Sequence, residues 1–186
     1  MARFVVLAED STDAEAIHAI LRKRLGRPTV QKHSAKGSAR LRNKAAPWLR
    51  LAARDGYERA ILLHDLDRDP RTQALNDEST LREELEAIPC PARIMRLVCI
   101  PVEELEAWFW SDPHVLADVA GRPFTASFSP HNIIGPKQKL RDLSRAANRK
   151  PRWSEQDNPR LAEMLDLELC ASRCPSMRRL LDFIGG

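Results

Sequence analysis

Two aspartates, Asp65 and Asp67, follow a short apolar run that begins at Ala60. Such a run, bounded by polar residues, is typical of a strand buried on both faces of a parallel sheet. Because side chains alternate along a strand, both carboxylates are expected to flank one point beyond its carboxyl end. Neighbouring carboxylates repel each other, and a divalent cation with oxygen ligands usually relieves that repulsion. The pattern therefore predicts a metal site, and an acidic, solvated turn is the plain alternative.

Further acids follow the other apolar runs. They are Glu9 and Asp13 after the first run, and Glu103, Glu104 and Glu106 after the last. Ligands of parallel sheets bind in the crevice beyond the carboxyl ends of the strands, and Glu9 is expected at the same edge of the sheet as Asp65. Glu103 and Glu106 are three apart and would share one face of a helix over 103–110. An acidic first turn favoured by the helix dipole would explain them equally well.

The order of apolar runs and helical patterns indicates the fold class. Strands are expected at 3–8, 29–33, from Ala60 onward and at 93–100, and helices at 14–25, 40–54 and 78–87. Strands alternating with helices give a mostly parallel sheet flanked by helices, with right-handed crossovers. We therefore predict a Rossmann-like α/β fold.

The second half of the chain is expected to be helical. Its predicted elements are the helix at 103–110, a short helix starting at Asp112-Pro113, a loop at 123–136, and helices at 137–147 (basic), 159–169 (acidic) and 177–184. No linker composition separates the two halves. We predict a single domain over 1–186, with a core of about 1–118 and a helical, basic elaboration of about 119–186.

Charge is strongly segregated behind a net charge of +4. The segment 16–54 has eleven Lys or Arg and no acid, and 55–118 has fifteen acids against six Arg. The segment 122–152 has eight basic residues and a single acid, Asp142. Two basic segments around an acidic centre suit a phosphate-rich polymer, DNA or RNA. Solvated helix faces would give the same pattern.

Composition excludes several classes. No segment is apolar enough to span a bilayer, and Glu9 and Asp10 interrupt the first apolar run, unlike a signal peptide. The four cysteines are Cys90, Cys99, Cys170 and Cys174. They lack zinc-ligand spacing, and the last two are expected on one helix face. Free thiols in a reducing cytoplasm, with no membrane association, are the expectation.

The ordered set of acids resembles a known domain. An acid after the first strand and Asp-x-Asp after the third are similar to the Toprim domain of topoisomerases, bacterial primases and overcoming-lysogenization-defect nucleases. The spacing of Glu9 and Asp13 is closest to these nucleases. The run Val-Glu-Glu-Leu-Glu-Ala-Trp at 102–108, Asp112, and Gly-Pro-Lys at 135–137 with Leu140 resemble a small bacterial Toprim-related family of unknown function.

The resemblance implies metal-assisted phosphoryl transfer. Glu9, Asp65 and Asp67 would hold one or two Mg2+ or Mn2+ ions, which neutralise phosphate charge and activate a water. The resemblance also implies that Asp13 and Glu106 hold a second ion, and that Lys137 contacts the phosphate or assists proton transfer. It further implies a Mg2+-dependent nuclease in defence against phage or other mobile DNA, with a partner protein of the defence system.

Two departures from the Toprim pattern bear on the local backbone. Asp10 stands where the family has glycine, and Asp tolerates left-handed backbone better than most residues. Asp69 stands at a second position that is often glycine.

Other interpretations stay open. A non-catalytic nucleic-acid-binding or regulatory module with the same fold is the main alternative. A haloacid-dehalogenase-type phosphatase would have its Asp-x-Asp near the N-terminus, and a phospho-receiver domain would have Lys after the last strand. Trp108 and Trp110 are expected in the core. His64 is expected to be buried and hydrogen-bonded, and to point away from the aspartate pair.

Overall fold

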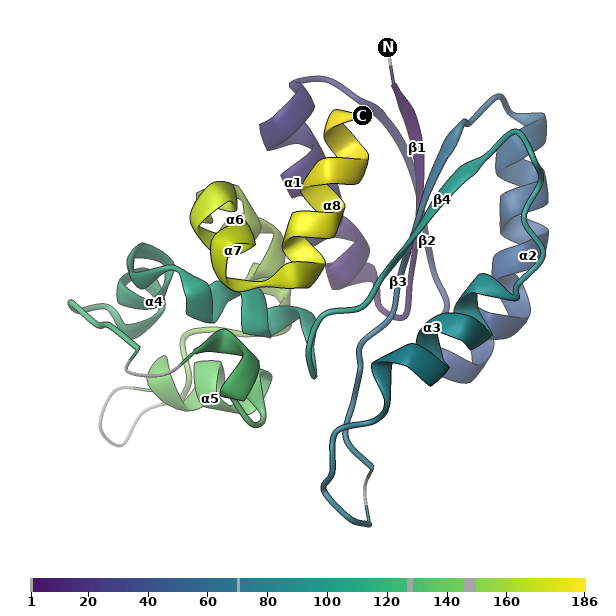
Figure 1. Ribbon diagram of the computed structural model, residues 1–186. Helices are drawn as coiled ribbons and strands as arrows, with labels where there is room; N and C mark the ends of the chain where they lie inside the picture. Colours follow the sequence, from purple (N-terminus) through teal and green to yellow (C-terminus); the bar gives the residue numbers. More distant parts are fainter. Residues whose placement is uncertain (1, 70, 127–128, 146–149) are drawn as a thin grey trace.

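The computed structural model describes residues 2–69, 71–126, 129–145 and 150–186 (Figure 1). The strands are β1 (Arg3–Ala8), β2 (Thr29–Ser34), β3 (Arg59–Leu63) and β4 (Met95–Cys99). The α-helices are α1 (Ser11–Leu25), α2 (Ser38–Arg54), α3 (Glu78–Glu86), α4 (Pro113–Ala120), α5 (Pro136–Leu143), α6 (Asn158–Met164), α7 (Leu167–Arg173) and α8 (Pro175–Gly185). Three 3-10 helices are η1 (Leu105–Ser111), η2 (Pro130–Asn132) and η3 (Glu155–Asp157). Within the described ranges, none of the helices combines the length and the apolar character needed to cross a bilayer.

The four strands form one parallel sheet in the order β2-β1-β3-β4. Leu7 of β1 pairs with Leu62 of β3, so these two central strands end side by side. The fold is therefore α/β and Rossmann-like, as the alternation of elements predicted. The expectation that Glu9 and Asp65 lie at the same edge of the sheet is also confirmed.

The sheet is covered by helices on both faces, as Figure 1 shows. Alternate residues of β1 enter two different hydrophobic clusters. Phe4 and Val6 pack on the face with α1 and α8, whereas Val5 and Leu7 pack against α2 and α3. This arrangement explains why β1 and β3 are apolar at successive positions: each strand buries both of its faces.

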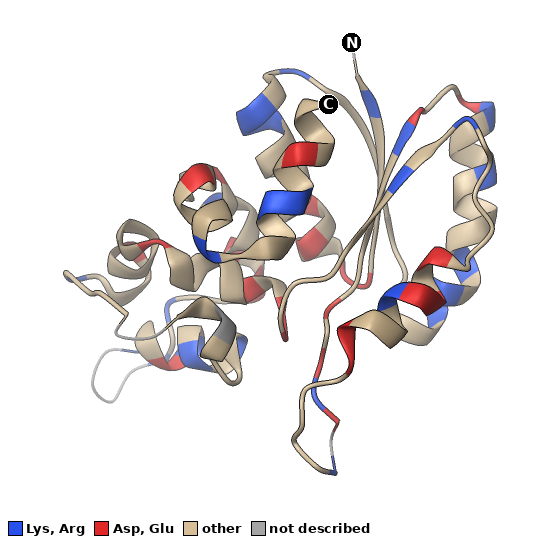
Figure 2. Ribbon diagram, in the orientation of Figure 1, with Lys and Arg blue, Asp and Glu red and all other residues tan. Residues whose placement is uncertain are grey.

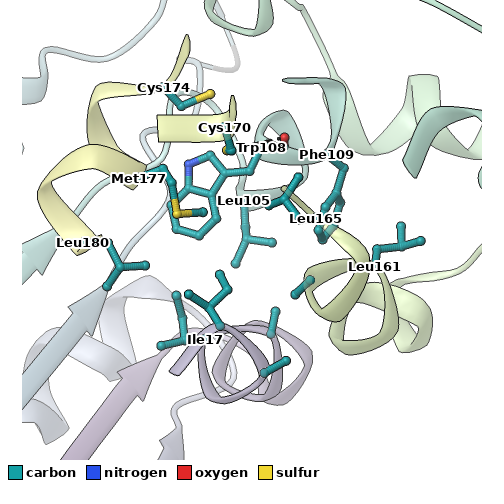
Figure 3. Close-up of a cluster of buried hydrophobic side chains, with 14 of the residues drawn as sticks. Ile17, Leu105, Trp108, Phe109, Leu161, Leu165, Cys170, Cys174, Met177 and Leu180 are labelled. Atoms are coloured by element: carbon teal, nitrogen blue, oxygen red, sulfur yellow. Dashed lines mark hydrogen bonds between the residues drawn. The ribbon is translucent and has the colours of Figure 1, made fainter. Parts of the chain in front are cut away.

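The C-terminal helices share the larger cluster with α1 and the sheet. Trp108 lies among Leu105, Cys170 and Met177 in Figure 3, and its Nε1 donates to Ser176 Oγ at 2.9 Å. The indole is 1% exposed, and that of Trp110 is also buried. The prediction that both tryptophans belong to the core is confirmed. The helical half is thus packed onto the sheet through one continuous apolar core.

Three predicted helices differ from the structure. The segment expected as a helix at 103–110 is the 3-10 helix η1, and Glu103 precedes it with a φ of 65°. The predicted helix at 137–147 ends at Leu143, with Ser144 buried and its Oγ donating to Arg141 O. The predicted end at 147 lies outside the described residues.

The predicted acidic helix at 159–169 is two helices. Leu165 has an extended ψ of 127° and is fully buried, and Asp166 caps the second helix by accepting from Leu169 N–H. Lys23 Nζ donates to the carbonyls of Glu163 and Leu165, which satisfies the last turn of α6. Burial of Leu165 and capping at both sides thus outweigh continuation of the helix.

Cys170 and Cys174 do not share a helix as predicted. Cys170 belongs to α7, whereas Cys174 lies between α7 and α8 with extended backbone. All four thiols are free; those of Cys99, Cys170 and Cys174 are buried, and that of Cys90 is half-buried.

Asp112 should stabilise the fold rather than act in chemistry. Its buried carboxylate caps α4 by accepting from His114 N–H and also accepts from Asp166 N–H, both at 2.8 Å. We expect Asp112→Ala to lower the free energy of unfolding by about 2 to 3 kcal/mol, because two partly buried amides lose their shared acceptor. Asp77→Ala, which removes an exposed cap of α3, should cost only about 1 kcal/mol. Chemical denaturation of both variants tests this, and equal losses would contradict it.

Candidate functional site

The order of the strands creates a crevice at the carboxyl ends of β1 and β3. The chain leaves β1 through α1 on one face and leaves β3 toward α3 on the other, so the connections diverge between these two strands. Such a switch point is where open α/β sheets bind ligands. Acidic residues gather at this edge in Figure 2. A cleft of about 400 Å³ lies here, lined by His64, Asp65 and Asp67 together with residues of α2 and α3.

Glu9 lies directly after β1 and is half-buried. Burial, followed by the carboxylates of Asp67 and Asp10, raises the pKa of Glu9 to about 7. Its Oε1 is buried and makes no hydrogen bond within the described part of the chain; His64 Nδ1 is 3.3 Å away. The adjacent Asp10 has a φ of −116°, so this turn is extended and does not require glycine.

Asp65 and Asp67 both line the cleft, but the strand geometry on which their predicted placement rested does not extend to them. β3 ends at Leu63, and Asp67 has a φ of 42°, so side-chain alternation does not continue to these residues. Asp65 Oδ1 accepts from Leu105 N–H at 3.1 Å. Asp67 is exposed in the cleft.

The side of the crevice near α1 carries the strongest electrostatic conflict. Burial and the carboxylate of Glu106 raise the pKa of Asp13 to about 7. Burial, followed by Asp13, Glu106 and Glu9, raises the pKa of Asp65 well above its usual value. Burial also raises the pKa of Glu106, which is 1% exposed. Four of the five predicted metal ligands (Glu9, Asp13, Asp65 and Glu106) therefore act on one another as neighbouring charges, and the fifth, Asp67, acts on Glu9.

Lys137, at the start of α5, is the cation among these acids. Its Nζ lies 3.8 Å from Glu104 Oε1 and 4.0 Å from the Oε1 atoms of Glu106 and Glu155. Although burial opposes it, this acidic surrounding raises the pKa of Lys137. Glu106 also accepts from Asn158 Nδ2 at 2.9 Å. The lysine expected to contact phosphate thus reaches the acidic side of the crevice as a charged group.

Glu103 and Glu104 do not form the acidic first turn of a helix over 103–110, which was one explanation of these residues. Their carboxylates accept hydrogen bonds from another helix. Gly135 N–H donates to Glu103 Oε1 and Lys137 N–H donates to Glu104 Oε2, both at 3.0 Å. Arg68 Nε donates to Glu103 Oε1 at 2.7 Å. The helix dipole argument therefore applies to α5, whose N-terminus these two carboxylates anchor. Lys137 is positioned through them.

Sequence reasoning missed part of the site. His64 was expected to point away from the acidic residues, but it contacts Glu9 and lines the same cleft as Asp67. Its Nδ1 donates to the carbonyl of Asp65 at 2.7 Å, and it is buried, as predicted. Burial lowers the pKa of His64. The sequence did contain a signal, since His64 directly precedes Asp65. A side chain beyond the end of a strand need not point to alternate faces of the sheet, so it can lie on the same side as its neighbour.

The basic segment at 16–54 does not gather around the crevice as a whole. Arg42 lines the cleft, where it pairs with Glu84 at 3.1 Å. Arg22 pairs with Glu163, and Lys32 pairs with Glu15 at 2.7 Å, on the opposite side of the sheet from α2. Part of this positive charge is thus balanced locally by acids.

The donor chemistry suits a hard divalent ion, but its cage is incomplete. Within the residues that the structure describes, no three carboxylate, imidazole or thiolate groups are placed so that they could hold a metal ion together. Carboxylates with raised pKa values and a buried Oε1 of Glu9 without a hydrogen bond are nevertheless the features that a nearby cation would relieve. Mg2+ fits such a site because it keeps several waters and needs only one or two protein carboxylates.

A family model matches most of the chain. The model of a family described as a domain of unknown function, DUF4276, matches residues 8–185. No curated protein and no solved structure is significantly similar to the chain. The family description assigns no activity, so the resemblance to Toprim domains stays a prediction. Because the match runs from the end of β1 to the end of α8 and includes the crevice acids and Lys137, the chain belongs to the DUF4276 family.

Proposed function

We propose that this protein is a divalent-metal-dependent phosphoryl-transfer enzyme, a Toprim-like nuclease acting on DNA or RNA. The observation that carries the proposal is the group of mutually repelling carboxylates at the β1/β3 switch point, with Lys137 among them. Perturbed acids in a cleft at such a position are a common mark of an active site. Mg2+ or Mn2+ is the ion that the oxygen donors favour.

The ion would be held by Asp65 with Glu9 or Asp67, and waters would complete its shell. Asp13 and Glu106 are the ligands proposed for a second ion. When bound, such ions supply charge neutralisation for the phosphate and a more acidic water. The side chains that the structure describes do not by themselves complete the coordination of either ion.

The chain's own residues supply positioning and charge. Glu104 and Glu106 hold Lys137 Nζ at 3.8 and 4.0 Å, so the ammonium group has a fixed place from which it can donate to a phosphate oxygen. Its raised pKa keeps it protonated. Lys137 would therefore act on a phosphate as a hydrogen-bond donor and a positive charge, and its predicted role in proton transfer stays a prediction.

The second candidate is a nucleic-acid-binding module without catalysis. Two observations favour it. The described residues do not provide three ligands for one metal ion, and Lys137 already offsets part of the acidic charge that an ion would neutralise. The two candidates differ in their need for a divalent ion.

The need for an ion can be tested with a charge-neutral variant of Asp67. Asn keeps the size of the side chain and tolerates the positive φ of this residue, which Ala would adopt only with strain. We expect Mg2+ or Mn2+ at about millimolar concentration to raise the melting temperature of the wild type, since a ligand stabilises the state it binds. Asp67→Asn should lose most of this shift and all Mg2+-dependent cleavage of DNA or RNA.

Asp69→Asn is the matched control, because Asp69 lies two residues further on and its carboxylate accepts from Arg71 and Thr72 N–H in an exposed turn. It should keep the ion effect. A wild-type melting temperature that neither ion changes would end the case for the metal site, and metal-independent binding of nucleic acid would then favour the second candidate.

The acidic conflict also predicts a pH dependence of stability. The pKa of Asp13 rises from 3.8 to about 7 on folding, so the folded state holds a proton that the unfolded state releases between these values. Stability from this residue is present below pH 3.8 and is lost as the pH rises toward about 7. We expect Asp13→Asn to stabilise the protein by about 2 to 4 kcal/mol above pH 7, with little effect near pH 3.8.

Denaturation across this pH range compares wild type with Asp13→Asn, so histidine titration cancels in the difference. Asp182→Asn, an exposed change on α8, serves as the control and should show no such trend. Added Mg2+ should reduce the wild-type loss. If the stability difference between wild type and Asp13→Asn does not change with pH, the neighbouring carboxylates and burial do not raise the pKa of Asp13.

A further inference from the structure

A second cleft lies at the opposite end of α5 from the acidic crevice. It has a volume of about 400 Å³ and is formed where the ends of α4 and α5 meet. Arg122, Arg145 and Arg152 line it, together with Ser144 and Gly121. The three arginines come from separate stretches of the chain, so their meeting is a result of tertiary structure.

The positive charge of this cleft is poorly balanced. Arg145, which follows the end of α5, has its Nη2 atom 3.8 Å from Asp142 Oδ1. Neither Arg122 nor Arg152 has a carboxylate partner within the described residues, and no acid lines the cleft. This differs from Arg22, Arg42 and the other paired bases of the first segment. Three guanidinium groups that share a cleft repel one another, and an anion with several oxygens would relieve the repulsion.

The backbone around the cleft holds Arg152 close to the ends of α4 and α5. Gly121 ends α4 with a φ of 66°, and a Cβ added there would lie 2.7 Å from the Nη1 atom of Arg152. Glycine thus allows the guanidinium to lie over the end of α4. Arg152 N–H also donates to the carbonyl of Ser144 at 3.4 Å, which holds this segment beside α5. An arginine is attracted by the carbonyls of one helix end, but that attraction does not require three of them.

We infer that this arginine cleft, formed by Arg122, Arg145 and Arg152, binds a phosphate of a polynucleotide backbone at a distance from the acidic crevice. The inference rests on the proposed function, because it concerns the substrate of the same site. α5 has eight residues and therefore spans about 12 Å, with Lys137 at one end and the arginine cleft at the other. That length corresponds to roughly three or four nucleotide steps of a duplex strand. A single small phosphate could not occupy both places, whereas a polymer could.

Arg122→Gln/Arg152→Gln removes the two unpaired charges without altering the crevice acids or Lys137. We expect the full-length variant to bind a fluorescent single-stranded oligonucleotide of about 20 nucleotides about tenfold more weakly than wild type. The slope of log K against log salt should fall in magnitude by about 0.7, because the cleft would no longer neutralise its one phosphate. Binding is measured in EDTA, which prevents metal-dependent cleavage.

Two comparisons make the result specific. Arg50→Gln/Arg54→Gln removes the same charge from exposed positions of α2 and should bind like wild type. Arg122→Lys/Arg152→Lys keeps both charges and should keep most of the salt dependence. Mg2+-dependent hydrolysis of bis(p-nitrophenyl) phosphate, which is too small to reach the arginine cleft, should be equal in wild type and all three variants.

The outcomes separate the inference from the proposed function. If wild type hydrolyses the small diester but Arg122→Gln/Arg152→Gln binds the oligonucleotide normally, the inference is wrong and the proposed function stands. If the Gln variant loses binding but no protein hydrolyses either substrate, the cleft is supported and the proposed nuclease activity is wrong. An equal loss of oligonucleotide affinity in the Arg50→Gln/Arg54→Gln control would overturn the inference. So would displacement of the oligonucleotide by inorganic phosphate at a concentration equal to that of the oligonucleotide's own phosphate groups.

Discussion

The repulsion among carboxylates at the ends of β1 and β3 is the constraint on which the rest of this structure depends. Parallel strands bring Glu9 and Asp65 to one edge, and α1 and η1 add Asp13 and Glu106 from the adjoining face. Burial makes each charge costly, and each neighbour adds to the cost, as the raised pKa values of these acids show. A fold tolerates such a cost where a cation or a proton offsets it.

The helical half of the chain supplies part of that offset. Lys137 reaches the acids from α5, and Asn158, at the start of α6, donates to Glu106. Glu103 and Glu104 in turn anchor the N-terminus of α5. The sheet and the helical elaboration therefore share one site as well as one hydrophobic core. The extent of the family match, from 8 to 185, agrees with this interdependence.

The sequence predicted what depends on local pattern. Apolar runs identified the strands, and their parallel order placed Glu9 and Asp65 together, because a buried strand must be apolar at successive positions. It failed where tertiary contacts decide the backbone. The positive φ of Asp67 and the break at Leu165 depend on the neighbouring η1 segment and on burial against α1. The pattern of apolar and polar residues along the sequence cannot predict either feature.

Distance decides how the two charged regions of α5 relate to each other. Two unit charges about 12 Å apart in water interact by only about 0.3 kcal/mol, and physiological salt screens this further, since the Debye length is about 8 Å. The arginine cleft therefore cannot neutralise the crevice acids, even though both lie at the ends of one short helix. A phosphate that approaches the crevice would still meet several carboxylates, with Lys137 and the Glu84-paired Arg42 as nearby cations. Under the proposed function, the charge of that phosphate would have to be balanced inside the crevice itself, and a divalent ion bound by the oxygen donors would do so.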